Sequence, residues 1–333
     1  MQRVRPWLVA TCAAVALTSA ACTGGSSPKG GTASGPAADI LSAVQASARA
    51  EALTTTIRLD STPATLQALA HAANATLTPP DAKALKNASI VIETARTGSK
   101  GASDTRVLEG GRTLFELRGT SDTLYLQADV RGILTLVHKR KVFADLRAAT
   151  KSMPGFVQAA LNGHWVSLPT AALASLAQAG GSGSAGSSGS GTRLLNDLHD
   201  VIKRDATVSV AGSDSRGQHY VISGDEQVLA GDLSSAIADA VPGGAFLGQR
   251  IPTTHAAHRT IHVDAWVKGG SLAAFSLDLA QFGDPGTVPA GTTVPLVVGF
   301  EQSGAPIEAP SGAVPVDLTQ LGTLVGALSG GGT

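Results

Sequence analysis

The chain has 333 residues and no net charge, because 25 Lys and Arg residues balance 25 Asp and Glu residues. This balance and the scarcity of aromatic side chains disfavour nucleic acid as a partner, since such partners require basic surfaces and aromatic stacking. We find no Lys/Arg cluster that would indicate a second, electrostatic membrane anchor either.

The first 22 residues have the organisation of a secretory signal. Arg3 and Arg5 precede an apolar run from Trp7 to Leu17, and Ser-Ala-Ala stands before Cys22. The apolar run is shorter than the roughly 20 residues that a membrane-spanning helix needs. We therefore expect removal of residues 1–21 and acylation of Cys22, which would anchor the chain to the outer face of the cell membrane. Ser-Ala-Ala also suits an ordinary signal peptidase, and the chain would then be freely secreted.

Three further segments follow from composition. Residues 22–37 are rich in Gly, Ser, Thr and Pro, which predicts a flexible tether. Residues 38–328 are predicted to form the folded α+β part. Within it, the Gly/Ser segment 180–191 is unusually long for a loop inside a domain and divides the chain into two halves, as one domain or two.

The first half reads as a helix followed by antiparallel strands. Apolar residues at Ile40, Leu41, Val44 and Ala48 predict a helix, and the Pro79-Pro80 pair is expected to break the chain. Period-two patterns predict strands at Leu53–Asp60, Ser89–Arg96, Thr105–Glu109, Arg112–Arg118 and Thr123–Val130. Short helices are predicted at Pro63–Ala73, Phe143–Ala149, Pro154–Leu161 and Thr170–Gln178, with Gly163–Pro169 extended.

The second half repeats this order of elements. Helices are predicted from Thr192 to Ile202 and from Glu226 to Val241. Strands are predicted at Ala206–Ala211, Gln218–Ser223, Thr260–Lys268, Ser271–Ala280 and Val294–Ser303. A helix followed by antiparallel strands, twice, predicts an α+β fold with amphipathic helices on one face of a long antiparallel sheet.

Motifs for catalysis are weak. Gly181–Gly186 has the glycine spacing of a dinucleotide fingerprint but lies in the Gly/Ser segment, outside any βαβ unit. Ser26–Lys29 matches Ser-x-x-Lys but lies in the predicted tether, and the sequence has no Gly-x-Ser-x-Gly nucleophile elbow. We therefore expect no catalytic residues, no metal and no cofactor.

Two groups of side chains leave alternatives open. His255, His258 and His262 are either solvated surface residues or metal ligands, and surface residues are favoured because the spacing fits no ligand motif. Tyr125 and Trp266 lie on the polar-parity side of their strands. They either show that both faces of the sheet are covered or line a ligand cavity.

Several segments resemble the LppX/LprG group of actinobacterial envelope lipoproteins. They are Gly119–Asp129 with Gly163–Leu168, Val263–Leu272, and Val294–Pro310 with its Gly-x-Pro and terminal Ala-Pro. The resemblance implies a strongly curved antiparallel half-barrel sheet with amphipathic helices on its concave face. It also implies a cavity for acylated lipids and a role in lipid binding or transport.

The residues predicted to line this cavity are the apolar ones Leu53, Ile57, Phe115, Leu117, Val263 and Phe275. The first functional hypothesis is a non-enzymatic lipoprotein that binds an acyl lipid or another hydrophobic small molecule. The second is a tethered interaction module that binds an envelope protein, and an enzyme is the least favoured of the three.

Overall fold

A computed structural model of the chain describes residues 35–97, 100–172, 202–204, 206–226, 228, 259–283, 286–302 and 306–321. The predicted signal, Cys22, nearly all of the tether, and the Gly/Ser segment lie outside these residues. So do His255, His258 and most of the two helices predicted in the second half.

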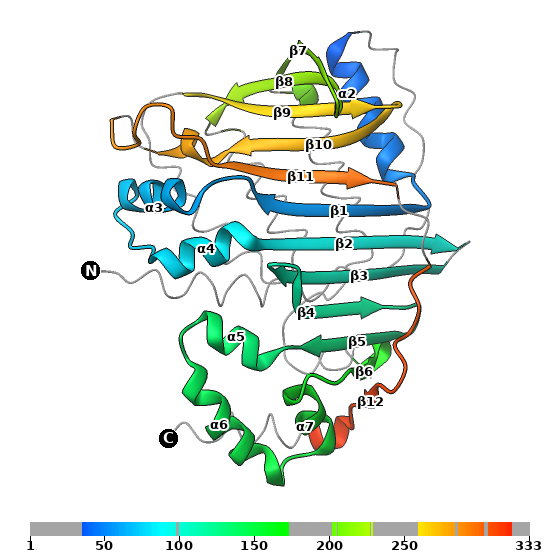
Figure 1. Cartoon of the computed structure of the whole chain (residues 1–333). Coiled ribbons are helices and arrows are strands. Elements are labelled where there is room, and N and C mark those ends of the chain that lie inside the picture. Colours follow the sequence, from blue (N-terminus) through cyan, green and yellow to red (C-terminus); the bar gives the residue numbers. More distant parts are fainter. Residues whose placement is uncertain are drawn as a thin grey trace.

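The described residues form one open sheet of 12 strands in the order β12-β6-β5-β4-β3-β2-β1-β11-β10-β9-β8-β7 (Figure 1). Its first-half strands are β1 (Ala52–Leu59), β2 (Ala88–Thr97), β3 (Lys100–Glu109), β4 (Arg112–Gly119), β5 (Thr123–Ala128) and β6 (Val166–Pro169). The others are β7 (Thr207–Asp214), β8 (Gly217–Asp225), β9 (Thr260–Lys268), β10 (Ser271–Asp278), β11 (Pro295–Glu301) and β12 (Val314–Pro315).

Neighbouring strands are antiparallel throughout this sheet, except for the short parallel pair of β12 and β6. The two halves of the chain meet where β1 pairs with β11, from Thr54 opposite Glu301 to Leu59 opposite Leu296. Hairpins connect most other neighbours, and Gly110-Gly111 and Gly269-Gly270 supply the positive φ angles of two of these turns. The predicted α+β class and open antiparallel sheet are confirmed.

Six described α-helices flank the sheet (Figure 1). They are α2 (Pro36–Ala48), α3 (Pro63–Ala72), α4 (Pro79–Asn87), α5 (Val130–Leu136), α6 (Arg140–Ala149) and α7 (Gly155–Leu161). The described part also contains the 3₁₀ turns η1 (Thr150–Ser152) and η2 (Leu279–Phe282), and residues 170–172, 202–204 and 318–321 are helical as well. Helix α2 packs on β7, β9 and β10, whereas α7 packs on β5, β6 and β12.

Two boundaries differ from the sequence prediction. Pro79-Pro80 begins α4 rather than breaking the chain, because the Thr78 side chain accepts a hydrogen bond from the Asp81 N–H, and proline is well tolerated in the first turn. Strand β5 ends at Ala128 because Asp129 caps a new helix, α5, by accepting a hydrogen bond from the Gly132 N–H at 2.8 Å.

Three hydrophobic clusters hold the helices to the sheet. The largest joins α2 to β8, β9 and β10 through Ile40, Ala43, Val44, Ile202, Tyr220, Ile222, Ala265 and Leu272. The second joins α3 and α4 to the chain beside β11 through Leu66, Ala82 and Val294. The third joins α7 to β6 through Phe156, Ala159 and Val166.

Candidate functional site

One face of the sheet is apolar from β8 to β5, and the strand register defines it. Residues directly opposite each other in an antiparallel pair lie on the same face. Ile57 is opposite Val298 of β11 on one side and Ile90 of β2 on the other. Ile90 is opposite Val107, and Val107 is opposite Phe115. We call this side of the sheet the apolar face.

All six residues predicted to line a cavity lie on the apolar face, although they come from four strands. Leu53 and Ile57 alternate along β1, and Phe115 and Leu117 alternate along β4. On β10 and β9, Phe275 is opposite Ala265, and Val263 lies two residues before Ala265. A T-shaped contact between the rings of Phe275 and Phe300, 5.9 Å between centroids, joins β10 to β11.

The apolar face has two parts that differ in burial. We call the part under α2 the covered face, where Ala265 is fully buried and Leu272 is 3% exposed. We call the part on strands β11, β1, β2, β3 and β4 the central face. Its apolar side chains are half-buried, except that Leu117 is buried, and they are Leu53, Ile57, Ile90, Ile92, Val107, Phe115, Leu117, Val298 and Phe300. The polar Ser103 and Thr105 of β3 lie on the same side and are buried.

Helix α2 is fixed to the covered face by two hydrogen bonds as well as by its apolar residues. The Leu272 N–H donates to Ser47 Oγ at 3.1 Å, at the point where a β-bulge shifts the register of β10. The Tyr220 hydroxyl donates to Asp39 at 3.2 Å. Burial, and then this contact with Asp39, raise the pKa of Tyr220.

The reverse side of the central face carries ion pairs. Arg106 pairs with Glu93, and Arg118 pairs with Glu116 at 2.6 Å and with Asp104 at 3.3 Å. Asp104 is 4% exposed. Its burial, followed by repulsion from Glu116, raises the pKa of Asp104 to about 6, although Arg118 and Arg106 lie beside it. The two sides of these strands therefore have opposite chemistry.

The Arg118 guanidinium also contacts the segment that connects β11 to β12. It donates to the backbone oxygen of Glu308 at 2.8 Å and lies 5.2 Å from the centroid of the Trp165 ring. These contacts tie the segment between β11 and β12 to the polar side of β4.

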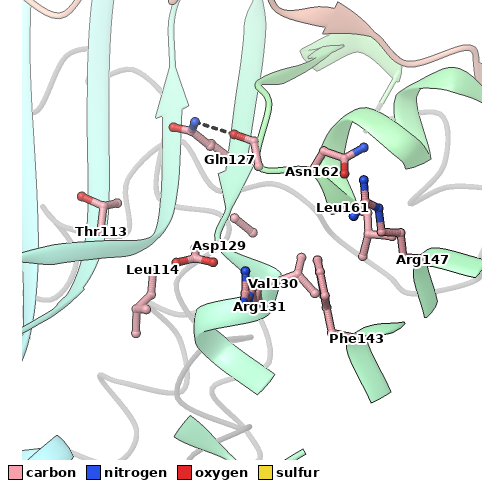
Figure 2. A pocket seen from close by; sticks show the side chains of 12 residues that line it. Thr113, Leu114, Gln127, Asp129, Val130, Arg131, Phe143, Arg147, Leu161 and Asn162 are labelled. Atoms are coloured by element: carbon pink, nitrogen blue, oxygen red, sulfur yellow. Dashed lines mark hydrogen bonds between the residues drawn. The ribbon is translucent and has the colours of Figure 1, made fainter. Parts of the chain in front are cut away.

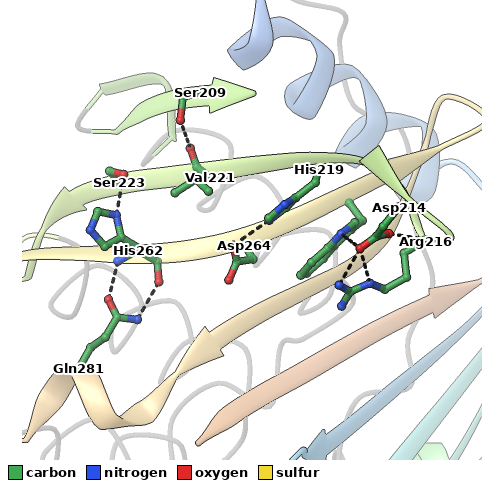
Figure 3. A network of polar contacts seen from close by, with 10 residues as sticks. Ser209, Asp214, Arg216, His219, Val221, Ser223, His262, Asp264 and Gln281 are labelled. Atoms are coloured by element: carbon green, nitrogen blue, oxygen red, sulfur yellow. Dashed lines mark hydrogen bonds and ion pairs between the residues drawn. The ribbon is translucent and has the colours of Figure 1, made fainter. Parts of the chain in front are cut away.

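A second polar network lies on β8 and β9 (Figure 3). The Trp266 indole is 3% exposed and stacks on His219, with 4.6 Å between ring centroids. Its N–H donates to Asp214 at 3.0 Å, and Arg216 covers the ring at 3.5 Å. Hydrogen bonds from Arg216 lower the pKa of Asp214 to about 2. The structure thus places Trp266 in a polar stack on the side opposite the apolar face.

His262 lies in the same network and is engaged by neighbouring side chains. It contacts Ser223 Oγ at 2.8 Å through its ring, and its backbone N–H donates to the Gln281 amide at 2.7 Å (Figure 3). Among the described residues, no group of three or more His, Cys, Asp or Glu side chains could hold a metal ion.

A pocket of about 550 Å³ lies at the end of β5, between that strand and helices α5, α6 and α7 (Figure 2). None of the six predicted residues lines it. Its apolar lining includes Leu114, Val130, Phe143 and Leu161, and its polar lining includes Gln127, Asp129, Arg131, Arg147 and Asn162. The sequence analysis missed this pocket because it ran the preceding strand to Val130 and predicted no helix over α5.

The charged side chains that line this pocket differ in whether they have ion-pair or hydrogen-bond partners. Asp129 pairs with Arg112 and accepts from the Gly132 N–H. The guanidinium groups of Arg131 and Arg147 have no hydrogen-bond or ion-pair partner among the described residues. The pocket also adjoins the central face, since Ala128 lines the pocket and is opposite Phe115.

Comparison with solved structures finds similarity to two mycobacterial proteins. The structure of LprF from Mycobacterium bovis matches with a TM-score of 0.37 and 12% identity, over 84% of this chain and 97% of that chain. The Mycobacterium tuberculosis lipoprotein LppX matches with a TM-score of 0.33 and 9% identity, over 82% and 97%. No family model and no curated protein sequence matches the chain.

Proposed function

We propose that the chain is an envelope lipoprotein that binds an acyl lipid, or another hydrophobic small molecule, against the central face. The observation that carries the proposal is the half-buried apolar surface shared by five adjacent strands. Burial of an acyl chain on such a surface contributes roughly 0.8 kcal/mol per methylene. A long acyl chain, with ten or more methylenes (about 8 kcal/mol), can therefore supply the binding free energy without any charged contact.

The proposed site needs no catalytic group. Leu53, Ile57, Phe115 and Leu117 offer only apolar contact, and Val263 and Phe275 extend the surface toward α2. Binding and transport of a ligand, rather than its conversion, is the activity that such a surface supports. Acylated Cys22 would hold this binding domain at the outer face of the membrane, and no helix of the described residues is long and apolar enough to cross a membrane.

Native mass spectrometry tests the proposal on the full chain carrying Cys22→Ser, which removes the acylation site. The protein is purified from an actinobacterial host so that it meets envelope lipids. We expect an added mass of one or two acyl lipids that is lost on denaturation. A bare polypeptide mass contradicts the proposal and favours the tethered module, for which a stoichiometric envelope protein should then co-purify.

Two variants on one strand locate the ligand. Ile57→Arg places a charge on the central face and should reduce the lipid-bound fraction by about tenfold or more. Thr54→Arg is the matched control, because Thr54 lies on the other side of β1, opposite Glu93 and Glu301. Equal lipid retention by folded Ile57→Arg and Thr54→Arg proteins would exclude the central face as the site.

A further inference from the structure

Helix α6 lies at the surface of the protein, and most of its side chains are exposed to solvent. It has no buried residue, and Phe143 alone is half-buried along its length. Val142 and Leu146 are 38% and 37% exposed, which places them among the most exposed large apolar side chains of the described part. Exposed aliphatic side chains that adjoin each other on one element mark an interaction surface.

The helical spacing separates the two sides of α6. Val142, Leu146 and Ala149 follow at i, i+4 and i+7 and form one stripe. Phe143 and Arg147 form the adjacent pair at i and i+4, and both line the pocket. Figure 2 shows Phe143 and Arg147 directed toward α5 and α7. The pocket therefore takes the side of α6 that carries Phe143 and Arg147, and the adjoining stripe is left exposed.

The charge around α6 is strongly basic in a chain that has no net charge. Residues 131–151 contain six Lys and Arg side chains and one acidic residue, Asp145. Three of the cations are consecutive and exposed at Lys139, Arg140 and Lys141. The preceding His138 is already engaged by Asp81 at 3.0 Å. This basic segment corrects the sequence analysis, which found no Lys/Arg cluster because the charge balance of the whole chain conceals the local excess.

We propose that α6 docks the folded domain on an anionic phospholipid surface. An apolar stripe flanked by Lys and Arg is the pattern of a helix that lies in the membrane interface, where its aliphatic residues enter the acyl boundary and its cations meet the headgroups. An acidic protein or a nucleic acid would use the cations but leave Val142 and Leu146 in water. Docking through α6 also brings the adjoining pocket, which Arg131 and Arg147 line, to the membrane surface.

Vesicle co-sedimentation tests this proposal on the full chain with Cys22→Ser, so that no acyl group contributes. We expect binding to vesicles that contain phosphatidylglycerol and not to vesicles of phosphatidylcholine alone. Raising the salt from ~0.05 to ~0.5 M should release the protein, because screening shortens the reach of its charges. Failure to bind phosphatidylglycerol vesicles at low salt would overturn the proposal, whether or not the protein carries lipid.

Two sets of variants separate the cations from the stripe. Lys139→Glu/Arg140→Glu/Lys141→Glu should weaken vesicle binding by about a hundredfold or more. Val142→Ser/Leu146→Ser should weaken it by about tenfold, because two aliphatic side chains no longer enter the bilayer. All five positions are exposed, so the fold is expected to persist, and circular dichroism checks this.

The controls match each set in charge or exposure. Lys83→Glu/Lys86→Glu removes two exposed cations from α4, and Leu318→Ser removes a leucine that is 41% exposed. Both controls should bind vesicles like the parent protein. Losses as large in the controls as in the α6 variants would show nonspecific attraction and overturn the assignment to α6. Retention of vesicle binding by both α6 variants would also overturn it and leave a protein partner as the occupant.

Discussion

The covered face packs against α2, whereas the central face lies on strands whose reverse side carries a half-buried ion-pair network. In the covered face, Ile40 and Val44 of α2 are 0% and 2% exposed, and Ala265 beneath them is fully buried. In the central face, Ile57 and Phe115 are half-buried, while Asp104 behind them is 4% exposed. The difference teaches that tight packing is confined to the part of the apolar face under α2. The central face keeps its apolar side chains partly in contact with water, as a ligand surface requires.

The largest loss of stability is expected when a fully buried side chain is truncated at the covered face. Ile40→Ala should lower the free energy of unfolding by about 2–5 kcal/mol, because the site is closed and the cavity cannot fill with water. Ile57→Ala on the central face should cost about 1 kcal/mol, because its side chain is already partly in water. Urea unfolding of both proteins measures the two values.

The two substitutions are matched in chemistry, since each deletes the same atoms from an isoleucine. Delipidated protein should be used, because a bound lipid stabilises the folded state. An equal loss for Ile40→Ala and Ile57→Ala would mean that the central face is packed as tightly as the covered face. That result would break the comparison and weaken the lipid proposal with it.

A smaller effect is expected at the hydrogen bond between α2 and the β-bulge. Ser47→Ala leaves the buried Leu272 N–H without its acceptor, which should cost about 2 kcal/mol. Ser276→Ala is the control, because Ser276 is a similarly buried serine, 8% exposed, on β10, the strand that also carries Leu272. Urea unfolding that shows no difference between the two variants would mean that α2 is held by its apolar contacts alone.

The sheet could be predicted well from sequence because its signal is local. Alternation of Thr with Leu and Ile placed β1, and glycine pairs placed the turns of the β3–β4 and β9–β10 hairpins. The starts of helices were harder to predict from sequence. The prolines after Thr78 are compatible with either a break in the chain or the first turn of a helix, and the capping hydrogen bond to Thr78 selects the helix. Asp129 ended β5 by the same kind of contact.

The candidate site was less accessible to sequence reasoning. The six predicted residues are apolar residues of the predicted strands. The alternation of apolar and polar residues along a strand can place such residues on one face of the sheet, but it cannot rank their burial. The pocket depends on α5, α6 and α7 converging on the end of β5, which no local pattern encodes. A window count of Lys and Arg over residues 131–151 would have revealed the basic segment.

The smallest predicted effect concerns the polar side of the central strands and their dependence on pH. The pKa of Asp104 is raised from 3.8 to about 6, so between these values the folded protein binds a proton that the unfolded chain releases. This group therefore favours folding fully below its unfolded pKa, and that contribution is lost as the pH rises through about 6.

Asp104→Asn isolates this contribution, because it keeps the size of the side chain and removes its titration. Relative to the Asp104→Asn variant, the parent should gain about 1 kcal/mol of unfolding free energy when the pH falls from about 7 to about 5. Subtracting the variant's urea unfolding curve at each pH cancels the other titrating groups that the two proteins share. A constant difference between the proteins across this range would mean that Asp104 is solvated as well as an ordinary carboxyl. The reverse side of the central strands would then hold no carboxyl that burial destabilises, and this contrast with the covered face would disappear.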